Sequence, residues 1–320
     1  MNPKVDYPLT IDFRAAHDGN ASTYPANGVH VRIVNVGQRL VLLDASGAGL
    51  DVEKASDGRF SGDPQAIFGQ WDEFREWAAA HGDHGGFAVD PAELGAPTPG
   101  PRQVFAIGLN YAEHVRESKM GRPDSPTVFT KFQSSITGPN ASVELPSRSV
   151  DWEVELVVVI GRLAHRVSEE AAYSHVAGFT VGQDLSERVV QLSGPVPQFS
   201  LGKSYPGFAP LGPALVTVDE LADPDDLELG CRLGEEVLQL GRTRDLMFGV
   251  PELIARLSAV CPLLPGDIIF TGTPSGVGVA RDPKRFIPPG AVLTSHIEGI
   301  GELRNEFVVG PGYEDSEGGN

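Results

Sequence analysis

Two glutamates stand two positions apart at the start of a long apolar run. The segment 151–161 begins with alternating acidic and apolar residues and continues as a β-branched run closed by glycine. In a strand, side chains alternate between faces, so Glu153 and Glu155 share one face, roughly 7 Å apart. Two carboxylates on a strand that enters the core repel each other and lose hydration unless a cation meets them. The pattern is typical of a hard divalent cation site, although a solvated strand face produces the same pair more often.

Asp184 is the first candidate to complete this pair, because it closes the apolar, glycine-containing segment 177–184. The ends of strands are where side chains reach a pocket. An acidic residue there can equally cap a helix that begins near Ser186. With Glu153 and Glu155 it would make a three-carboxylate site, which suits Mg²⁺ or Mn²⁺, with Ca²⁺ as a further option, and does not suit zinc.

Further polar residues follow Asp184. Arg188 and Gln191 stand four and seven positions after it, which predicts one helical face for all three. An arginine near a metal balances its carboxylates or holds an anionic substrate, and an ordinary salt bridge explains it equally well. Lys203 lies among small and apolar residues, so it is harder to explain as solvated surface.

His114 and Glu117 stand three positions apart in the short polar segment 110–117, where we expect a helical turn. The carboxylate can then orient the imidazole and raise its basicity, which suits histidine to take a proton from water. Surface helices also contain many such pairs. The segment 271–278 lacks the P-loop lysine and the spacing of a dinucleotide fold, so it predicts a tight turn that offers hydroxyls and amides to a carboxylate.

The elements that must position these residues are mostly strands. Apolar runs and alternation predict strands at 29–34, 39–43, 104–108, 127–132, 142–145, 151–161, 177–184, 227–233, 237–240 and 268–272, and two more within 291–309. Helical periods predict helices at 64–80, 168–176, 186–192 and 245–260. In the first of these helices, Ile67, Trp71, Phe74 and Trp77 make a stripe that should face the core. The prediction is a mainly β fold with a few helices (α+β).

Composition limits the function classes. The 320 residues are 41% hydrophobic and 21% charged, and 25 Lys and Arg against 43 Asp and Glu give a net charge of −18. That charge disfavours nucleic acid and anionic membrane as partners, and an anionic substrate would need local cations. Two cysteines without metal-type spacing predict reduced thiols in a cytoplasmic protein, and neither a signal peptide nor a membrane-spanning run is evident.

Turn-rich segments divide the chain. The Pro/Gly cluster at 95–101 predicts a linker, which separates a small N-terminal domain, 1–98, from a larger second domain, 99–310. The acidic, glycine-rich residues 311–320 predict a disordered tail. The histidine- and glycine-containing segment 81–86 could hold a metal, but its glycines favour a mobile turn.

Taken together, the motifs resemble the fumarylacetoacetate hydrolase family over about residues 102–309. The residues that carry the resemblance occur in the family's order: Asn110-Tyr111-Ala112-Glu113-His114 with Glu117, Glu153-Val154-Glu155, Asp184 with Arg188 and Gln191, Gly202-Lys203-Ser204, and Gly266 to Gly278. The resemblance implies a catalytic domain built as a mixed β-roll or sandwich, usually paired as a homodimer. Asn110 stands where larger members have an additional aspartate ligand, which is similar to the smaller acylpyruvate-type members.

The resemblance also implies roles for the site residues. The metal ligands would be Glu153, Glu155 and Asp184, for Mg²⁺ or Mn²⁺. The water-activating pair, on a lid that orders when ligand binds, would be His114 and Glu117. The residues around the substrate would be Lys203 beside the metal, Arg188 and Gln191 lining the pocket, and Thr273 binding a substrate carboxylate.

The leading hypothesis is a metal-dependent hydrolase that cleaves a carbon–carbon bond in a β-diketo acid, such as an acylpyruvate or fumarylpyruvate, through a metal-bound enolate. His114 would deprotonate the attacking water, and Lys203 would stabilise the oxyanion. The alternative on the same site is an oxaloacetate-type decarboxylase or a 2-hydroxymuconate-type diacid isomerase. A silent 2-oxo-acid-binding domain is a rival of another class, which the filled catalytic-type positions disfavour. The expected partners are a small anionic 2-oxo acid and a second copy of the chain.

Overall fold

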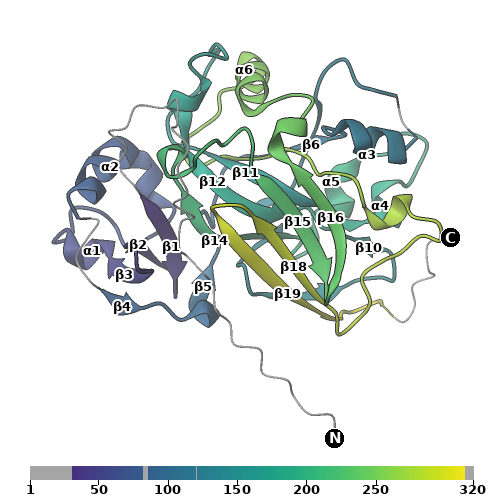
Figure 1. Cartoon of the computed structure of the whole chain (residues 1–320), viewed down its shortest axis with the longest axis horizontal. Helices are drawn as coiled ribbons and strands as arrows, with labels where there is room; N and C mark the ends of the chain where they lie inside the picture. The colour runs from purple at the N-terminus through teal and green to yellow at the C-terminus, as the bar shows by residue number, and fades with distance from the viewer. Residues whose placement is uncertain (1–30, 82–85, 120, 314–320) are drawn as a thin grey trace, which may run out of the picture.

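A long mixed sheet forms the centre of the molecule (Figure 1). The computed structural model describes residues 31–81, 86–119 and 121–313. Within them, the sheet runs in the order β4 (Phe87–Ala88), β3 (Ala48–Asp51), β2 (Arg39–Leu43), β1 (Arg32–Val36), β14 (Ala209–Val216), β12 (Val176–Gln183), β11 (Val154–Ile160), β17 (Ile268–Phe270), β6 (Val104–Gly108) and β7 (Thr127–Thr130). At its margins β5 (Leu94–Gly95) pairs with β1, and β8 (Ile136–Thr137) pairs with β14. The predicted fold class, mainly β with a few helices, is confirmed.

A second sheet packs against the first. Its order is β16 (Glu236–Arg242), β15 (Glu228–Leu233), β18 (Val292–Ile297), β19 (Gly301–Val309) and β9 (Ser142–Leu145). Contacts join β19 to β14, β18 to β12 and β15 to β11, so the two sheets face each other. The short pair β10 (Val150–Asp151) and β13 (Ser186–Glu187) lies beside the start of β11.

The unbroken apolar run of β11 is explained by burial on both of its faces. Val154, Leu156 and Val158 point into the core between the two sheets, whereas Val157 and Val159 point into a second core on the opposite face. A strand buried on both sides reads as a continuous hydrophobic run rather than an alternation. This double burial places the start of β11, with its glutamates, deep in the molecule.

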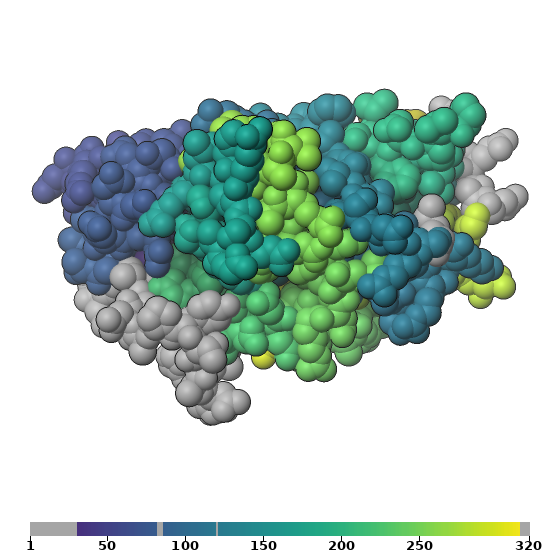
Figure 2. Space-filling model, turned by 90° about the horizontal axis from the view of Figure 1, so that it is seen from above, coloured from purple at the N-terminus to yellow at the C-terminus, as the bar shows by residue number. Residues whose placement is uncertain are grey.

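The N-terminal elements cover that opposite face. η1 (Ala66–Gln70) and α2 (Trp71–Ala79) contribute the predicted aromatic stripe, which packs in the same core as Val157 and Val159. β1 pairs with β14, so the large sheet is continuous across the proposed boundary at residue 98. Figures 1 and 2 show these elements gathered at one end of the molecule. The large sheet therefore contains strands from both predicted domains, and the division into two domains stays a prediction.

Most helices near the site are short. They are α3 (Ala112–Glu117), α4 (Arg188–Gln191) and α5 (Phe199–Gly202), whereas α6 (Val250–Val260) has three turns. The helix predicted at 168–176 is only the 3₁₀ turn η4 (Ala172–His175). The helix predicted at 186–192 starts later, because Ser186 pairs with Asp151 and Glu187 is the N-cap that accepts a hydrogen bond from Val190. No helix among the described residues is both long and apolar enough to cross a bilayer.

Parts of four predictions lie outside the described residues. They are residues 1–30 of the predicted N-terminal domain, the beginning of the strand at 29–34, most of the turn at 81–86, and residues 314–320 of the tail. Residues 311–313, at the start of the predicted tail, form a turn. Tyr313 is buried there, and the Arg148 guanidinium lies 4.7 Å from its ring centre in a cation–π contact.

Candidate metal centre and active site

Three carboxylates converge where β11 begins and β12 ends. Asp184 follows β12 directly, and its amide donates to the Glu153 carbonyl at 2.9 Å, which extends the β11–β12 ladder by one step. As a result, Glu153, Glu155 and Asp184 each offer an oxygen within 4.8 Å of the others. All three are buried, with exposed fractions of 6%, 1% and 0%. The structure thus brings together the three residues predicted as metal ligands.

Two lysines neutralise part of this charge. Lys203 Nζ donates to Glu153 Oε2 at 2.8 Å and to Asp184 Oδ2 at 2.6 Å. Lys131 Nζ donates to Asp184 Oδ1 at 2.7 Å and also contacts the Lys203 carbonyl. Both lysines are almost fully buried. Asp184 is therefore held by charge, and it does not cap the helix that follows it.

Glu155 is the carboxylate of the three that forms no ion pair with a lysine or arginine of the described part of the chain. Its Oε2 accepts a hydrogen bond from the Gly272 amide at 2.7 Å. Burial raises its pKa well above the ordinary value, and the charges of Asp184 and Glu153 raise it further. Burial would also raise the pKa of Glu153, but Lys203 and Arg188 outweigh it and hold that pKa below its ordinary value.

The donor set fits a hard divalent cation. Four buried acids (Asp151, Glu153, Glu155 and Asp184) meet three buried bases (Lys131, Arg188 and Lys203). One of these acids is therefore left without a compensating base. Glu155 is the one whose pKa is raised, first by burial and then by the charges of Asp184 and Glu153. Oxygen ligands without histidine or cysteine are those that Mg²⁺, Mn²⁺ or Ca²⁺ prefer.

Arg188 lies beside the cluster and is committed to protein acceptors. It donates from Nε and Nη2 to Asp151 Oδ2 at 2.8 and 2.6 Å and from Nη1 to Gln191 Oε1 at 2.8 Å. Its Nη2 also lies 2.8 Å from Glu153 Oε1. This arrangement favours charge balance as its role, while Arg188 and Gln191 both line the cavity as predicted.

The His114–Glu117 pair forms as its spacing predicts. His114 Nδ1 lies 2.7 Å from Glu117 Oε1, and Glu117 Oε2 accepts from the Gly276 amide at 2.9 Å. The second contact ties α3 to the glycine-rich turn after β17. Because Glu117 occupies Nδ1, the ring presents Nε2 as the nitrogen available for proton transfer.

Thr273 and Asn110 are fixed by internal hydrogen bonds. Thr273 Oγ1 donates to the Val154 carbonyl at 2.8 Å and accepts from Gln239 Nε2 at 2.8 Å. The Asn110 side chain donates to the carbonyls of Phe248 and Thr271 and accepts from the Phe248 amide. Its amide group therefore joins the backbone at these two positions and is not placed as a metal ligand. Substrate binding by Thr273 stays a prediction.

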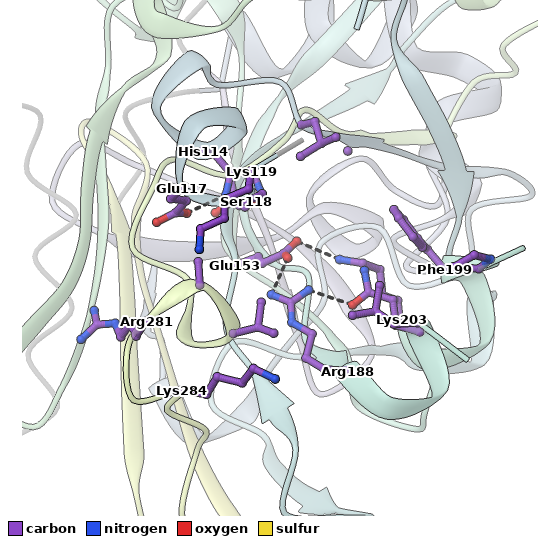
Figure 3. Close-up of a pocket in the computed structure, with 18 of the residues that line it drawn as sticks. His114, Glu117, Ser118, Lys119, Glu153, Arg188, Phe199, Lys203, Arg281 and Lys284 are labelled. Atoms are coloured by element: carbon purple, nitrogen blue, oxygen red, sulfur yellow. Dashed lines mark hydrogen bonds and ion pairs between the residues drawn. The ribbon is translucent and has the colours of Figure 1, made fainter. Parts of the chain in front are cut away.

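A single cavity of about 910 Å³ exposes these groups (Figure 3). Its polar lining comes from segments far apart in the sequence, and it includes His114, Glu117, Glu153, Glu155, Arg188, Gln191, Lys203 and Thr273. Asp184 lies behind this lining, where Lys131 and Lys203 hold it. Apolar residues such as Phe129, Pro197 and Phe199 form one wall. A small polar ligand that enters the cavity meets the dyad and the carboxylates together.

Sequence reasoning missed two buried residues of the site. Lys131 stands in the segment 129–132 between two phenylalanines, and only its apolar neighbours hinted at burial. Asp151 is the first residue of the segment 151–161, where it fits the alternation of acidic and apolar residues and shows no sign of a separate role. In the structure Asp151 binds Arg188 and accepts from the amides of Gly278 and Val279 at 2.7 and 2.9 Å.

The fold and site define an enzyme class with a mixed β architecture and a buried carboxylate triad facing a histidine–glutamate pair. A family model for the fumarylacetoacetate hydrolase C-terminal domain matches residues 103–308. The chain therefore belongs to the fumarylacetoacetate hydrolase family, and it is an enzyme of that family.

Two curated relatives from mammals are similar to this chain over about two thirds of its length. The Bos taurus protein named oxaloacetate tautomerase FAHD2A, mitochondrial, is 46% identical over 215 residues, which cover 67% of this chain and 68% of that protein. Its Homo sapiens counterpart of the same name is 45% identical over the same coverage. These names favour the alternative, a reaction on the oxaloacetate or diacid-isomerase side, over hydrolysis of a carbon–carbon bond.

Solved structures share the fold. A crystal structure assigned to an HpcE protein from Mycobacterium smegmatis has a TM-score of 0.83 and 53% identity, covering 87% of this chain and 99% of that chain. A 5-carboxymethyl-2-hydroxymuconate delta-isomerase from the same organism has a TM-score of 0.67 and 30% identity over 88% and 100%. A maleylpyruvate hydrolase from Sphingobium, solved with manganese(II) and pyruvate, has a TM-score of 0.71 and 28% identity over 87% and 99%.

The expectation of a cytoplasmic protein needs correction. The bovine and human relatives are named as mitochondrial, which conflicts with an assignment to the cytoplasm alone. Cys231 and Cys261 are free thiols, as expected, and the cytoplasmic assignment was based on them. Free thiols indicate a reducing environment, and they do not distinguish between reducing compartments.

Proposed function

We propose that this chain is a metal-dependent enzyme that catalyses keto–enol tautomerisation of a small 2-oxo diacid of the oxaloacetate class. The observation that carries the proposal is that one cavity brings the His114–Glu117 pair to the buried carboxylate cluster. The names of the bovine and human relatives support the substrate class. The manganese ion and pyruvate in the maleylpyruvate hydrolase structure support a divalent cation and a 2-oxo acid.

In the enol-to-keto direction the substrate gains one proton and loses another. The 2-hydroxyl releases its proton, the C2–C3 double bond accepts a proton at C3, and the C2 carbonyl forms, so no carbon–carbon bond breaks. Mg²⁺ or Mn²⁺ held by Glu153, Glu155 and Asp184 would supply Lewis-acid stabilisation of the negative charge on the C2 oxygen.

The chain's own residues move the proton and set the charge. His114, through Nε2, would carry the proton to or from C3, because Glu117 fixes the ring through Nδ1. Lys203 would place positive charge beside the C2 oxygen while it holds Glu153 and Asp184 in position. Gln191 and Thr273 remain candidates for contacts with the substrate carboxylate.

A second candidate is hydrolysis of a β-diketo acid, which the His114–Glu117 pair favours because it also suits activation of a water. The maleylpyruvate hydrolase neighbour supports this reading at 28% identity. The two candidates share the carboxylate cluster and differ in whether a carbon–carbon bond breaks.

The test begins with dialysis against a chelator. Mg²⁺ or Mn²⁺ is then returned with enol oxaloacetate and an acylpyruvate in parallel, and ketonisation is followed by ultraviolet absorbance and cleavage by release of pyruvate. We expect metal-dependent ketonisation, abolished by Glu153→Ala and lowered about 10²–10⁴-fold by His114→Ala. Ketonisation that survives Glu153→Ala would refute the metal site. Cleavage of acylpyruvate without ketonisation would favour the second candidate.

A further inference from the structure

The strand that carries two of the metal ligands loses its regular partners where those ligands stand. On one side, the residue pairs between β11 and β17 stop at Val157. On the other side, β12 ends just before Asp184, whose carbonyl accepts from the Ser186 hydroxyl at 2.9 Å. A buried backbone amide without an acceptor is costly, so the amides of Glu153 and Val154 need acceptors from elsewhere.

Two glutamine side chains supply these acceptors. Gln183 Oε1 accepts from the Glu153 amide at 2.8 Å, and Gln239 Oε1 accepts from the Val154 amide at 3.0 Å. Consecutive amides of a strand point to opposite edges, so the two glutamines hold the start of β11 from both sides. A glutamine amide carries the same kinds of donor and acceptor as a peptide unit, and here it takes the place of a strand partner.

Each glutamine also donates to a group that is itself held in place. Gln183 Nε2 donates to the Ser295 hydroxyl on β18 at 2.9 Å. Gln239 Nε2 donates to Thr273 Oγ1 at 2.8 Å and to the Pro274 carbonyl at 2.7 Å. Because Gln239 belongs to β16, both glutamines connect the start of β11 to the second sheet. The two side chains are 0% and 2% exposed, so bulk water has little access to these bonds.

The backbone held in this way sets the spacing of the carboxylates. Val154 lies between two of the ligands, and its carbonyl accepts from Thr273 Oγ1 at 2.8 Å. The Gly272 amide, one position earlier in the chain than Thr273, donates to Glu155 Oε2 at 2.7 Å. Gln239 therefore reaches the backbone between the ligands directly and, through Thr273, the turn that orients Glu155.

From this arrangement we infer that Gln183 and Gln239 are positioning residues of the metal centre, which fix its carboxylates at the separation that a divalent cation requires. Neither side chain lines the cavity, so each acts through the backbone of β11. The inference rests on the metal centre of the proposed function, and it does not depend on which reaction that centre catalyses. Loss of a group that orients a metal ligand lowers metal affinity about 10- to 100-fold.

The test measures the affinity of the full chain for Mn²⁺ without substrate. Wild-type protein, Gln183→Met and Gln239→Met are dialysed against a chelator and titrated with Mn²⁺, and the electron paramagnetic resonance signal of free Mn²⁺ gives Kd. Methionine is close to glutamine in length and volume and removes the hydrogen bonds. We expect Kd to rise about 10- to 100-fold in each variant. An unchanged Kd in either variant would overturn the inference, and if one variant does not fold, the other decides.

Thr243→Val is the matched control for a general loss of stability. Thr243 directly follows β16, is 2% exposed, and accepts from the Leu227 amide through Oγ1 at 2.8 Å. Like Gln239→Met, this substitution leaves one buried backbone amide without its acceptor, but on a segment that carries no metal ligand. It should lower the Tm of the metal-free protein, as the glutamine variants do, and leave Kd for Mn²⁺ unchanged. An equal rise of Kd in the control would assign the effect to packing and overturn the inference.

The ketonisation assay separates this inference from the proposed reaction. If the wild-type protein binds Mn²⁺ but does not ketonise enol oxaloacetate, the proposed reaction fails, and the Kd values still decide the role of the two glutamines. If the wild-type protein binds no Mn²⁺, the metal centre fails and the inference fails with it.

Discussion

At the residue scale, Glu155 is the group whose environment most clearly requires a cation. Without one, it is a buried carboxylate beside two others, and burial followed by the charges of Asp184 and Glu153 raises its pKa. We expect Glu155→Gln to raise the Tm of chelator-treated protein by about 2–4 °C, since an uncompensated charge is removed at a gain of about 1 kcal/mol. The same substitution should abolish the rise in Tm that saturating Mg²⁺ produces in the wild-type protein.

Differential scanning fluorimetry with and without Mg²⁺ measures both effects. Glu144→Gln is the control, because Glu144 is exposed on β9 and faces away from the core. It should change neither the Tm of the metal-free protein nor the response to Mg²⁺. A Glu155→Gln protein that keeps the full response to Mg²⁺ would show that the cation is held without this carboxylate.

The site could be predicted from sequence only where a local rule connects the residues. The period of two in a strand relates Glu153 to Glu155, and helical spacing relates His114 to Glu117. Lys131 has no such relation to Asp184, which lies 53 positions away, and it reaches the carboxylate only because two segments fold together. A long-range ion pair of this kind leaves no periodic signal in one sequence.

At the element scale, the same limit applies to strand pairing. The apolar residues that predict β1 and β2 as strands lie close together in the sequence. The pairing of β1 with β14, in contrast, joins segments about 180 residues apart. The helix predicted at 168–176 is only a 3₁₀ turn at Ala172–His175, with a turn before it at 169–171 and the first residue of β12, Val176, after it. The sequence therefore predicts that an element exists, whereas the strands it pairs with and its exact ends depend on tertiary packing.

The junction of β2, β3 and α1 (Val52–Ala55) predicts a dependence of stability on pH. Arg39 Nε and Nη2 donate to Asp51, which also caps α1 by accepting from the Lys54 amide. The hydrogen bond from Arg39 is the main reason that the pKa of Asp51 falls from 3.8 to about 2. A lowered folded-state pKa contributes stability that is complete above pH 3.8 and is lost as the pH falls towards 2.

Asp51→Asn isolates that charge, because asparagine caps a helix as well as aspartate does. The free energy of unfolding, measured by urea titration at several pH values, should be lower than in the wild-type protein above pH 4. The difference should shrink as the pH approaches the folded-state value of about 2. Asp124→Asn, at an exposed loop position, should show no such trend. A constant difference at every pH would assign the effect to packing rather than to charge.

At the scale of the whole molecule, the expected homodimer needs an apolar surface, and one lies beside the active site. α5 contacts both α4 and β7, and these neighbouring elements with their flanking turns carry exposed apolar side chains: Val128, Phe132, Val189, Leu192, Val196 and Leu201. Val196 and Leu201 are 72% and 67% exposed, and a monomer rarely leaves such a group uncovered in one place. We propose that a second copy of the chain covers this face.

Val196→Glu with Leu201→Glu should then convert a dimer into a monomer, because pairing the faces would bury charges against each other. Light scattering after gel filtration should give about twice 34.0 kDa for the wild-type protein and 34.0 kDa for the variant. Val260→Glu is the control, since Val260 is 88% exposed at the end of α6, and it should leave the mass unchanged. Leu192 and Pro197 also line the catalytic cavity, so loss of the partner should loosen one of its walls and raise KM as well. A variant that keeps the wild-type mass would place the dimer contact on another face.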